Sequence, residues 1–299
     1  MMVDRREKVL GCIFGGAIGD SFGAIYEGSP AGAVVKPGKV LQLTDDTQLT
    51  LATCEAIAAE QGRIEVAGIA RRFAEWHCAR RVTGAGASTL GALTALVNGG
   101  HWALVGRKGE RAAGNGAAMR IAPLAFCYDS QDPVARRAVR DVARITHHNE
   151  EAYVGALAVV LAVRAALDGS WATADSLLPL VSSQLPDTNV KDRLLLFEEI
   201  APTLPLAEVA AQWGCSGYVV ESVPLALYAA NQAQWLGFEQ MISQLIACGG
   251  DTDTIAAIAG QVVGTLAGHH QLPQHMLAQV PQSSLIEEIA TAFADCLKV

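Results

Sequence analysis

Apolar residues recur every three or four positions along most of the chain, the spacing that places them on one face of an α-helix. In residues 66–81, Ile69 and Phe73 fall on an apolar stripe, while charged side chains occupy the opposite face. Residues 150–169 begin with two glutamates, are apolar on nearly every side and end at Gly169. Acids favour the first turn of a helix and glycine its end, so this segment is predicted to be a central, buried helix.

The helical periodicity continues to the end of the chain, and only the short segments 39–44 and 101–106 have the character of strands. Further helices are predicted over 45–60, 86–98, 116–128, 133–146, 172–184, 190–201, 218–233, 238–247, 253–267 and 284–297. The sequence shows no internal repeat, low-complexity tract or linker-like stretch. We therefore expect an all-α fold in which residues 1–299 form a single domain.

Composition limits the classes of function. The chain carries 22 Lys and Arg against 30 Asp and Glu, a net charge of −8, and its pI is near 5.4. Binding to nucleic acid in general, or to an anionic membrane surface, needs a basic surface, so neither is expected as a general role. Hydrophobic residues make up 51% of the chain and charged residues 17%, which predicts a large core rather than disorder.

The cysteines and the N-terminal segment indicate a reducing compartment. The seven cysteines are odd in number and form no C-x-x-C pair, which is typical of free thiols rather than of disulfides or a zinc site. The first residues superficially resemble a signal peptide, but Asp4 and Glu7 precede the apolar run and Asp20 ends it early. We expect this run to be a helix of the folded domain, with no membrane association and a cytoplasmic location.

Glycine is unusually frequent inside two apolar helical segments, where each glycine normally costs about 0.5–1 kcal/mol relative to alanine. These residues are Gly11, Gly15, Gly16, Gly19 and Gly23 in the first segment and Gly260, Gly264 and Gly268 in the second. Two interpretations are open from the sequence: the helices pack closely together, or a ligand lies against their backbones.

Two carboxylate-rich segments each lead into an apolar helix. The sequence TDDT occupies residues 44–47, and GGDTDT occupies residues 249–254. Each alone is accounted for by helix capping, because Thr and Asp are favoured at helix starts. Neighbouring carboxylates repel each other, however, and two such clusters beside core sequence are typical of a cation site. Oxygen donors without a nearby His or Cys favour Mg²⁺, Mn²⁺ or Ca²⁺ over zinc.

A magnesium–diphosphate motif of the DDxxD type is a competing interpretation of the first segment. It fails because Leu49 stands where that motif requires a further acid. Residues 249–254 lack the pattern as well. The carboxylates therefore fit another kind of metal site better.

Together these segments resemble the ADP-ribosylglycohydrolase family, which contains the dinitrogenase-reductase-activating glycohydrolase and the ADP-ribosyl-acceptor hydrolases. Seven segments carry the resemblance, in this order: GCIFGGAIGDSFGAIYEG (11–28), LTDDTQLTLA (43–52), GAGASTLGAL (84–93), GNGAAMRIAPLA (114–125), ITHHNEEAYVGA (145–156), ESVPLALYA (221–229) and GGDTDTIAAIAGQVVG (249–264). Each segment alone is weak evidence for the resemblance, whereas seven segments in the same order are specific to the family. The resemblance implies a multi-helical orthogonal bundle with two divalent cations, Mg²⁺ or Mn²⁺.

The resemblance also assigns roles to residues of this chain. The implied metal ligands are Thr44, Asp45, Asp46, Asp251, Asp253 and Thr254. Glu27 matches an acid near the scissile bond and is, with Asp253, an expected catalytic residue. The positions that match the ADP-ribose pocket are Gly114, Asn115, Gly116 and His147.

The residue types alone are also compatible with purely structural roles at several of these positions. Glu27 follows an apolar helix and would otherwise be a solvated acid, and Asn115 between two glycines is typical of a turn. His147 lies near a predicted helix start, where a capping role is an alternative. Asp20 lies inside a helix and is expected to support the site rather than bind metal, while Arg120 could pair with a phosphate or with an acid.

The implied activity is metal-dependent release of ADP-ribose from an ADP-ribosylated protein or small ADP-ribosyl compound. Metal-oriented water would cleave the bond at the anomeric carbon of the distal ribose. The diphosphate would lie at a helix start, either 86–90 or 114–118. Gly84 and Ala85 replace an acid of arginine-type members, and residues 111–113 differ from the serine-type loop, so the acceptor stays open.

Two other classes remain possible at this point. One is a non-catalytic protein of the same fold that binds ADP-ribose or neutralises a toxin, but such a protein has no need of all six metal-ligand matches. The other is a metal-dependent phosphohydrolase acting on a nucleotide, which would need no ribose pocket. The preferred metal, the biological partner and the oligomeric state are not encoded in any pattern that we recognise.

Overall fold

Helices account for nearly all regular structure in the computed structural model, which describes residues 4–34, 39–128 and 133–297. The α-helices are α1 (Arg5–Gly23), α2 (Asp45–Ala59), α3 (Val66–Cys78), α4 (Ala87–Val97), α5 (Trp102–Val105), α6 (Pro133–Arg144), α7 (Glu150–Asp168), α8 (Leu178–Ser182), α9 (Asn189–Glu199), α10 (Leu206–Trp213), α11 (Val219–Leu236), α12 (Phe238–Cys248), α13 (Thr252–Ala267), α14 (Gln274–Leu277) and α15 (Ser283–Cys296). The 3₁₀ turns are η1 (Ala24–Tyr26), η2 (Glu110–Ala112), η3 (Asn115–Ala117), η4 (Ala122–Phe126), η5 (Trp171–Thr173) and η6 (His269–Gln271). The all-α prediction is confirmed.

Strand content is smaller than the sequence suggests, and it lies elsewhere. The only sheet among the described residues pairs β1 (Arg107–Lys108) with β2 (His147–His148) in parallel. Residues 39–44 have no regular structure, and residues 101–106 contain the short helix α5. The imidazole of His101 caps α5 by accepting a hydrogen bond from the Ala103 N–H. A local cap therefore outweighs the weak strand character of this segment.

The segment 116–128, predicted to be one helix, consists instead of two 3₁₀ turns, η3 and η4, joined by a short turn. Gly116 weakens the helical propensity of the run, and Pro123 removes a backbone donor from its middle. The apolar side chains are buried nevertheless, because they face the same core as the helices around them.

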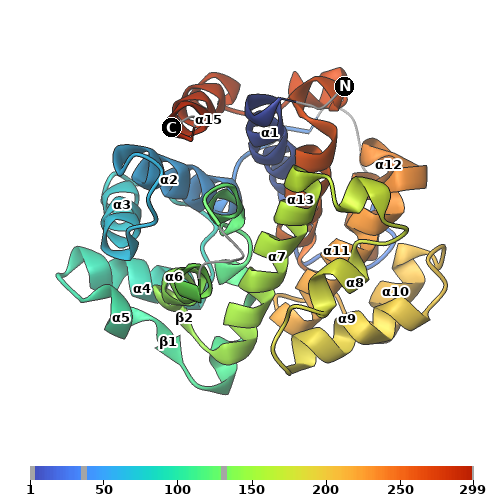
Figure 1. Ribbon diagram of the computed structural model, residues 1–299, viewed down its shortest axis with the longest axis horizontal. Helices are drawn as coiled ribbons and strands as arrows, with labels where there is room; N and C mark the ends of the chain where they lie inside the picture. The colour runs from blue at the N-terminus through green and yellow to red at the C-terminus, as the bar shows by residue number, and fades with distance from the viewer. Residues whose placement is uncertain (1–3, 35–38, 129–132, 298–299) are drawn as a thin grey trace.

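Helix α7 is the central, buried helix that its sequence predicts. Asn149 caps its start by accepting a hydrogen bond from the Ala152 N–H, and Gly169 ends it in the left-handed region at φ 82°. Figure 1 shows α7 in the middle of the molecule, with α2 to α6 on one side and α8 to α12 on the other. One cluster of buried apolar side chains connects both sides through this helix.

Helices α1 and α13 lie against each other in antiparallel directions, and their glycines form the contact. A methyl group at Gly15 would overlap the carbonyl oxygen of Gly260, and one at Gly11 would overlap that of Gly264. The packing interpretation of these glycines is therefore the right one, since backbone and not ligand occupies the space. Gly23, at the end of α1, faces the backbone of Asp253 at the start of α13.

Helix α1 is also apolar enough to be mistaken for a membrane-spanning segment. Together with η1 it covers Arg5–Tyr26, which is long enough to cross a bilayer, but 89% of its apolar window is buried inside the structure. Burial of this kind is typical of the core helix of a folded protein. Among the described residues no other helix meets the same criteria of length and composition.

We expect the substitution Gly15→Ala to destabilise the protein by about 1–3 kcal/mol, because the added methyl has to push two backbones apart. Urea unfolding measures this change. Gly91→Ala is the matched control, since Gly91 lies on the exposed face of α4 with nothing within 4 Å of a Cβ. That substitution should stabilise by about 0.5–1 kcal/mol. Equal effects of the two substitutions would contradict the packing role of Gly15.

Candidate metal centre

The start of α2 is capped by residues other than its paired aspartates. Thr44 is the N-cap, and its hydroxyl lies 2.8 Å from Oδ1 of Asp20 and 3.0 Å from Oδ2 of Asp46. The Asp20 carboxylate, reaching across from α1, accepts hydrogen bonds from the N–H groups of Thr44 and Thr47. Asp20 therefore has the supporting role that its position in a helix predicts. Because the cap is already supplied, capping does not account for Asp45 and Asp46.

The start of α13 lies beside the loop that carries Glu27. Gly250 accepts a hydrogen bond from the N–H of Gly28, at 2.7 Å, and donates its own N–H to Ser29. Gly249 and Gly250 adopt φ values of 74° and 73°, which L side chains rarely adopt, so these glycines permit the tight approach. The acids at the start of α13 and Glu27 therefore face a common space.

The N-cap position of α13 is Asp251, and its side chain makes no capping hydrogen bond. Instead Oδ2 of Asp251 accepts a hydrogen bond of 2.8 Å from the Asn115 amide. Asn115 does begin the 3₁₀ turn η3, as its neighbours suggest for a turn residue, but its side chain also orients an acid of the site. A side-chain partner of this kind fixes the direction in which a carboxylate points.

The acids converge into two groups of three that share Asp253. Carboxylate oxygens of Asp20, Asp46 and Asp253 lie within 4.8 Å of one another, and so do those of Glu27, Asp251 and Asp253. The Thr254 hydroxyl donates to Oδ2 of Asp46 at 3.2 Å and links the starts of α2 and α13. Carboxylate oxygens gathered in this way are suited to divalent cations.

The protein balances only a small part of the charge of this cluster, through the effect of Arg120 on Asp45. Burial, and then the charge of Asp20, raises the pKa of Asp45 to about 7. Burial, and then the charge of Asp251, raises the pKa of Asp253 to about 9, and burial with the charge of Asp253 raises the pKa of Asp46. No ion pair joins any of these acids to a Lys or Arg among the described residues, and Oδ1 of Asp46 is buried without a hydrogen-bond partner there. Buried carboxylates without counter-charge fit divalent cations, for which oxygen donors are suited.

A cavity of about 250 Å³ opens above the cluster. Its lining includes all the predicted site residues except Thr44, whose hydroxyl donates to Asp46: Glu27, Asp45, Asp46, Gly114, Asn115, Gly116, His147, Asp251, Asp253 and Thr254. Three further lining residues are not identified from the sequence: Met119 lies within the segment 114–125 but is apolar, and Arg107 and Gly217 lie outside the seven segments. One wall is the start of α4, from Gly86 to Thr89.

His147 forms part of the cavity wall as a neutral ring. Burial, and then the charges of Arg120 and Arg107, lowers the pKa of His147 to about 3. Its Nδ1 lies 2.8 Å from the Thr146 hydroxyl, so Nε2 is the nitrogen that faces Gly114. A Cβ at either Gly114 or Gly116 would crowd this ring, so the two glycines provide the space that it occupies.

Among the described residues Arg120 forms no ion pair with an acid, although its charge partly offsets the rise in the pKa of Asp45. It is fully buried and donates hydrogen bonds of 2.8 Å to the Gly116 carbonyl and to the Thr146 hydroxyl. Its guanidinium also lies 4.9 Å from the centre of the Phe73 ring. Arg120 therefore supports the turn that carries Asn115 and the residue next to His147, and it does not line the cavity.

Comparison with known proteins identifies relatives along the whole length of the chain. The sequence matches the profile of the ADP-ribosylglycohydrolase family over residues 1–298. It is 27% identical to ADP-ribosylhydrolase ARH3 of Gallus gallus, with 89% of this chain and 87% of that protein covered. It is also 27% identical to the Homo sapiens ARH3 and to the uncharacterized protein YegU of Escherichia coli, the latter with 97% of both chains covered. A solved ADP-ribosylglycohydrolase-related protein complex superposes with a TM-score of 0.76 at 26% identity, covering 98% of each chain.

Proposed function

The chain belongs to the ADP-ribosylglycohydrolase family, and from this membership and its acidic centre we propose that it is a metal-dependent hydrolase. It releases ADP-ribose from an ADP-ribosylated protein or small compound by cleaving the bond at the anomeric carbon of the distal ribose. The observation that carries the proposal is the cluster of carboxylates that lines the cavity, formed by Glu27, Asp46, Asp251 and Asp253.

The residues of this cluster are suited to two divalent cations, Mg²⁺ or Mn²⁺. Asp46 and Asp253 would hold one cation, with Thr44 and Thr254 beside them. Asp251 and Asp253 would hold the second cation, and Asp45 lines the same cavity. Four aspartates balance the charge of two dications, which leaves a nearly neutral centre. Bound cations of this kind orient a diol and lower the pKa of water, so no Ser or Cys nucleophile is required.

Glu27 is the residue best placed to move a proton. Its carboxylate lies within 4.8 Å of those of Asp251 and Asp253, on a residue that is exposed at the mouth of the cavity. Burial of part of the group, and then the charge of Asp251, raises the pKa of Glu27 above its usual value. A raised pKa brings a carboxyl group toward the range in which it exchanges protons near neutral pH. Glu27 therefore acts as general acid or base at the scissile bond.

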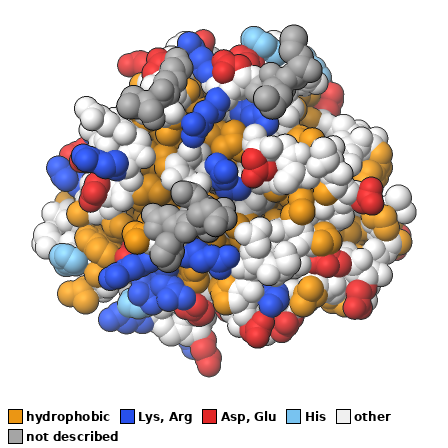
Figure 2. Space-filling model, in the orientation of Figure 1, with side chains coloured by type: hydrophobic (Ala, Val, Ile, Leu, Met, Phe, Trp, Pro, Cys, Tyr) orange, Lys and Arg blue, Asp and Glu red, His pale blue; other side chains and the backbone are white. Residues whose placement is uncertain are grey.

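The start of α4 provides a place for the diphosphate. Gly86 is the N-cap of this helix, and the cavity wall continues from it to Thr89. Unpaired N–H groups and the helix dipole favour an anion at this end. Arg107 lines the same cavity and supplies a positive charge there. Figure 2 shows that Lys and Arg side chains gather over α6, although the chain as a whole is acidic.

Activity on three defined substrates tests the proposal. Purified protein would be incubated with ADP-ribosyl-arginine, ADP-ribosyl-serine and O-acetyl-ADP-ribose, each with Mg²⁺, Mn²⁺ or EDTA. We expect release of ADP-ribose from at least one of them with metal and none with EDTA, and the substrate that reacts names the acceptor class. Binding of ADP-ribose without release from any substrate would favour a binding protein instead.

The role of Glu27 makes a separate prediction. Glu27→Gln should lower kcat by about 10²–10⁴-fold, since general acid–base catalysis contributes that much, while the affinity for ADP-ribose stays within a few-fold. Steady-state kinetics and calorimetric titration with ADP-ribose measure the two quantities. Glu75→Gln, on an exposed residue of α3 that pairs with Arg72, is the control and should change neither. Unchanged kcat in Glu27→Gln would exclude Glu27 from proton transfer.

A further inference from the structure

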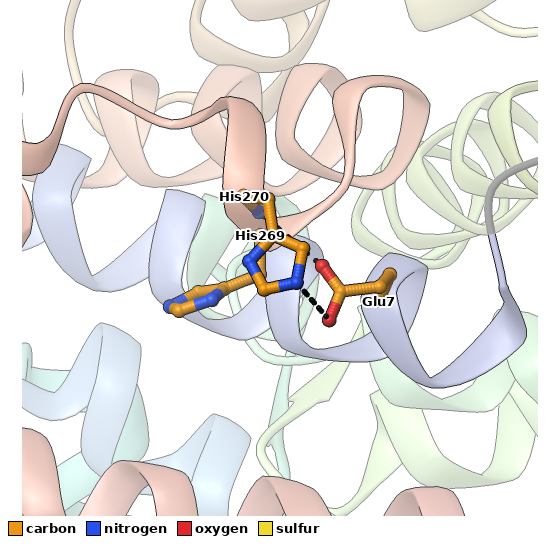
Figure 3. Close-up of side chains that lie close together, drawn as sticks. All are labelled: Glu7, His269 and His270. Atoms are coloured by element: carbon orange, nitrogen blue, oxygen red, sulfur yellow. Dashed lines mark hydrogen bonds and ion pairs between the residues drawn. The ribbon is translucent and has the colours of Figure 1, made fainter.

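Three possible metal ligands meet at the other end of the α1–α13 pair. Glu7 lies in the first turns of α1, and His269 and His270 form the start of η6, directly after α13. Figure 3 shows the His270 ring turned toward the Glu7 carboxylate, while the His269 ring lies on the far side of the His270 ring from Glu7. Nε2 of His270 is 3.3 Å from Oε1 of Glu7, and one donor atom from each residue lies within 4.8 Å of the other two.

The backbones that carry these residues are held in place by the glycine contact between the helices. A methyl group at Gly11 would overlap the backbone of Gly264 and come within 2.9 Å of Gly268, the residue just before His269. Glu7 accepts a further hydrogen bond of 3.2 Å from the backbone N–H of His270. The ring of His269 packs on Phe14, with the ring centres 4.8 Å apart. The backbones of the three residues are therefore held close together by the packing of the fold itself.

The donor set differs in kind from that of the acidic centre. Two imidazole nitrogens and one carboxylate oxygen suit Zn²⁺ and its neighbours in the transition series, whereas Mg²⁺ prefers oxygen alone. Ligands about 2.0–2.1 Å from a tetrahedral ion lie about 3.3 Å from each other, which is the separation of Nε2 of His270 and Oε1 of Glu7. The His270 side chain is 81% exposed, so solvent has access to the place that an ion would occupy.

We propose that Glu7, His269 and His270 bind one Zn²⁺-like transition-metal ion, which joins the start of α1 to the turn that follows α13. This site is distinct from the acidic centre, because Glu7 and Asp20 are separated by about 20 Å of helix at a rise of 1.5 Å per residue. The ion stabilises the same helix pair that carries Asp20 and Asp253 at its other end. The site is independent of the proposed hydrolase activity.

A second His–Glu contact on the surface provides a matched control. Nε2 of His275 lies 3.2 Å from Oε1 of Glu239, and both side chains are exposed. No third His, Cys, Asp or Glu completes a cluster with them among the described residues. This pair shares the carboxylate–imidazole contact with the proposed site but lacks the third donor, so it should not hold an ion.

Calorimetric titration with Zn²⁺ tests the proposal, using metal-stripped protein kept in excess Mg²⁺ and a thiol-free buffer. Wild type and His275→Ala should each bind one equivalent of Zn²⁺ with the same affinity. In His269→Ala and in His270→Ala the affinity for this equivalent should be lower by about tenfold or more. The cysteines and the acidic centre are the same in all four proteins, so their contributions cancel. Zn²⁺ binding of wild-type strength and stoichiometry in both His269→Ala and His270→Ala would overturn the proposal.

Thermal melting separates loss of the site from loss of the fold. In EDTA, His270→Ala should melt at the wild-type temperature, because the side chain is largely exposed. Zn²⁺ at about a hundredfold excess over its Kd should raise the Tm of wild type and of His275→Ala by on the order of 5 °C. The Tm of His270→Ala and of Glu7→Gln should not rise. An equal rise in all four proteins would contradict the assignment of these ligands.

Discussion

Replacing Asp253 by asparagine should abolish turnover and at the same time stabilise the metal-free protein. Asp253 is the member common to both carboxylate groups, so its loss removes a ligand from each cation position. Loss of several kcal/mol of metal-dependent stabilisation of the transition state lowers kcat by on the order of 10³-fold or more. In EDTA the same substitution removes a buried acid whose pKa is raised to about 9 by burial and then by the charge of Asp251. The neutral amide should therefore raise the free energy of unfolding by a few kcal/mol.

The two effects have opposite signs, which separates a chemical defect from a folding defect. Steady-state kinetics in Mn²⁺ would show the loss of activity, and thermal melting in EDTA would show the gain of stability. Asp187→Asn is the control, since Asp187 is fully exposed and pairs only with Lys191. Substantial turnover in Asp253→Asn would exclude the proposed metal role, and a lower Tm in EDTA would contradict the electrostatic account of the cluster.

The fold class could be predicted because helical periodicity and capping are local properties of the sequence. Helix α7 illustrates this, since its apolar run, its Asn149 cap and its terminal Gly169 are all visible in the sequence. The prediction of two strands was wrong because strand formation, unlike helix formation, is not a local property. A strand needs a partner to pair with, and the sequence of 39–44 does not say whether one exists. The turns η3 and η4 depend likewise on how an apolar run meets a core already formed by other helices.

The acids of the site are visible in the sequence, but their supports are not. Asp45 and Asp253 stand in conspicuous motifs, whereas the capping of α2 by Asp20 joins residues that are distant in the chain. The same is true of Arg120, whose hydrogen bonds run to Gly116 and to Thr146. Contacts of this kind depend on which helices pack together, and that information is not local. Motifs therefore indicate the chemistry of a site, while its positioning groups emerge only from the packing.

Without bound metal, the stability of the protein should fall as the pH rises from about 7 to 8.5. Burial, and then the charge of Asp20, raises the pKa of Asp45 to about 7, and burial, and then the charge of Asp251, raises that of Asp253 to about 9. The folded protein therefore keeps protons that the unfolded chain releases near pH 4, and stability declines wherever the folded state holds more protons. Each carboxyl that stays protonated contributes about 1.4 kcal/mol per pH unit. Buried thiols add to this decline as the pH approaches 8.5, because burial raises the pKa of Cys12 and of Cys127 to about 12 while unfolded thiols ionise near pH 8.5.

Divalent cations should weaken this pH dependence, because they bind the ionised carboxylates and compete with protons for them. Melting temperatures at pH 7, 7.75 and 8.5 should fall more steeply in EDTA than in Mn²⁺, so that the two series diverge. Asp253→Asn should have a shallower slope in EDTA than wild type, because one of the retained protons is gone. The divergence requires a cluster that carries more negative charge than the protein alone can balance. Equal slopes in EDTA and in Mn²⁺ would contradict the binding of cations by these carboxylates.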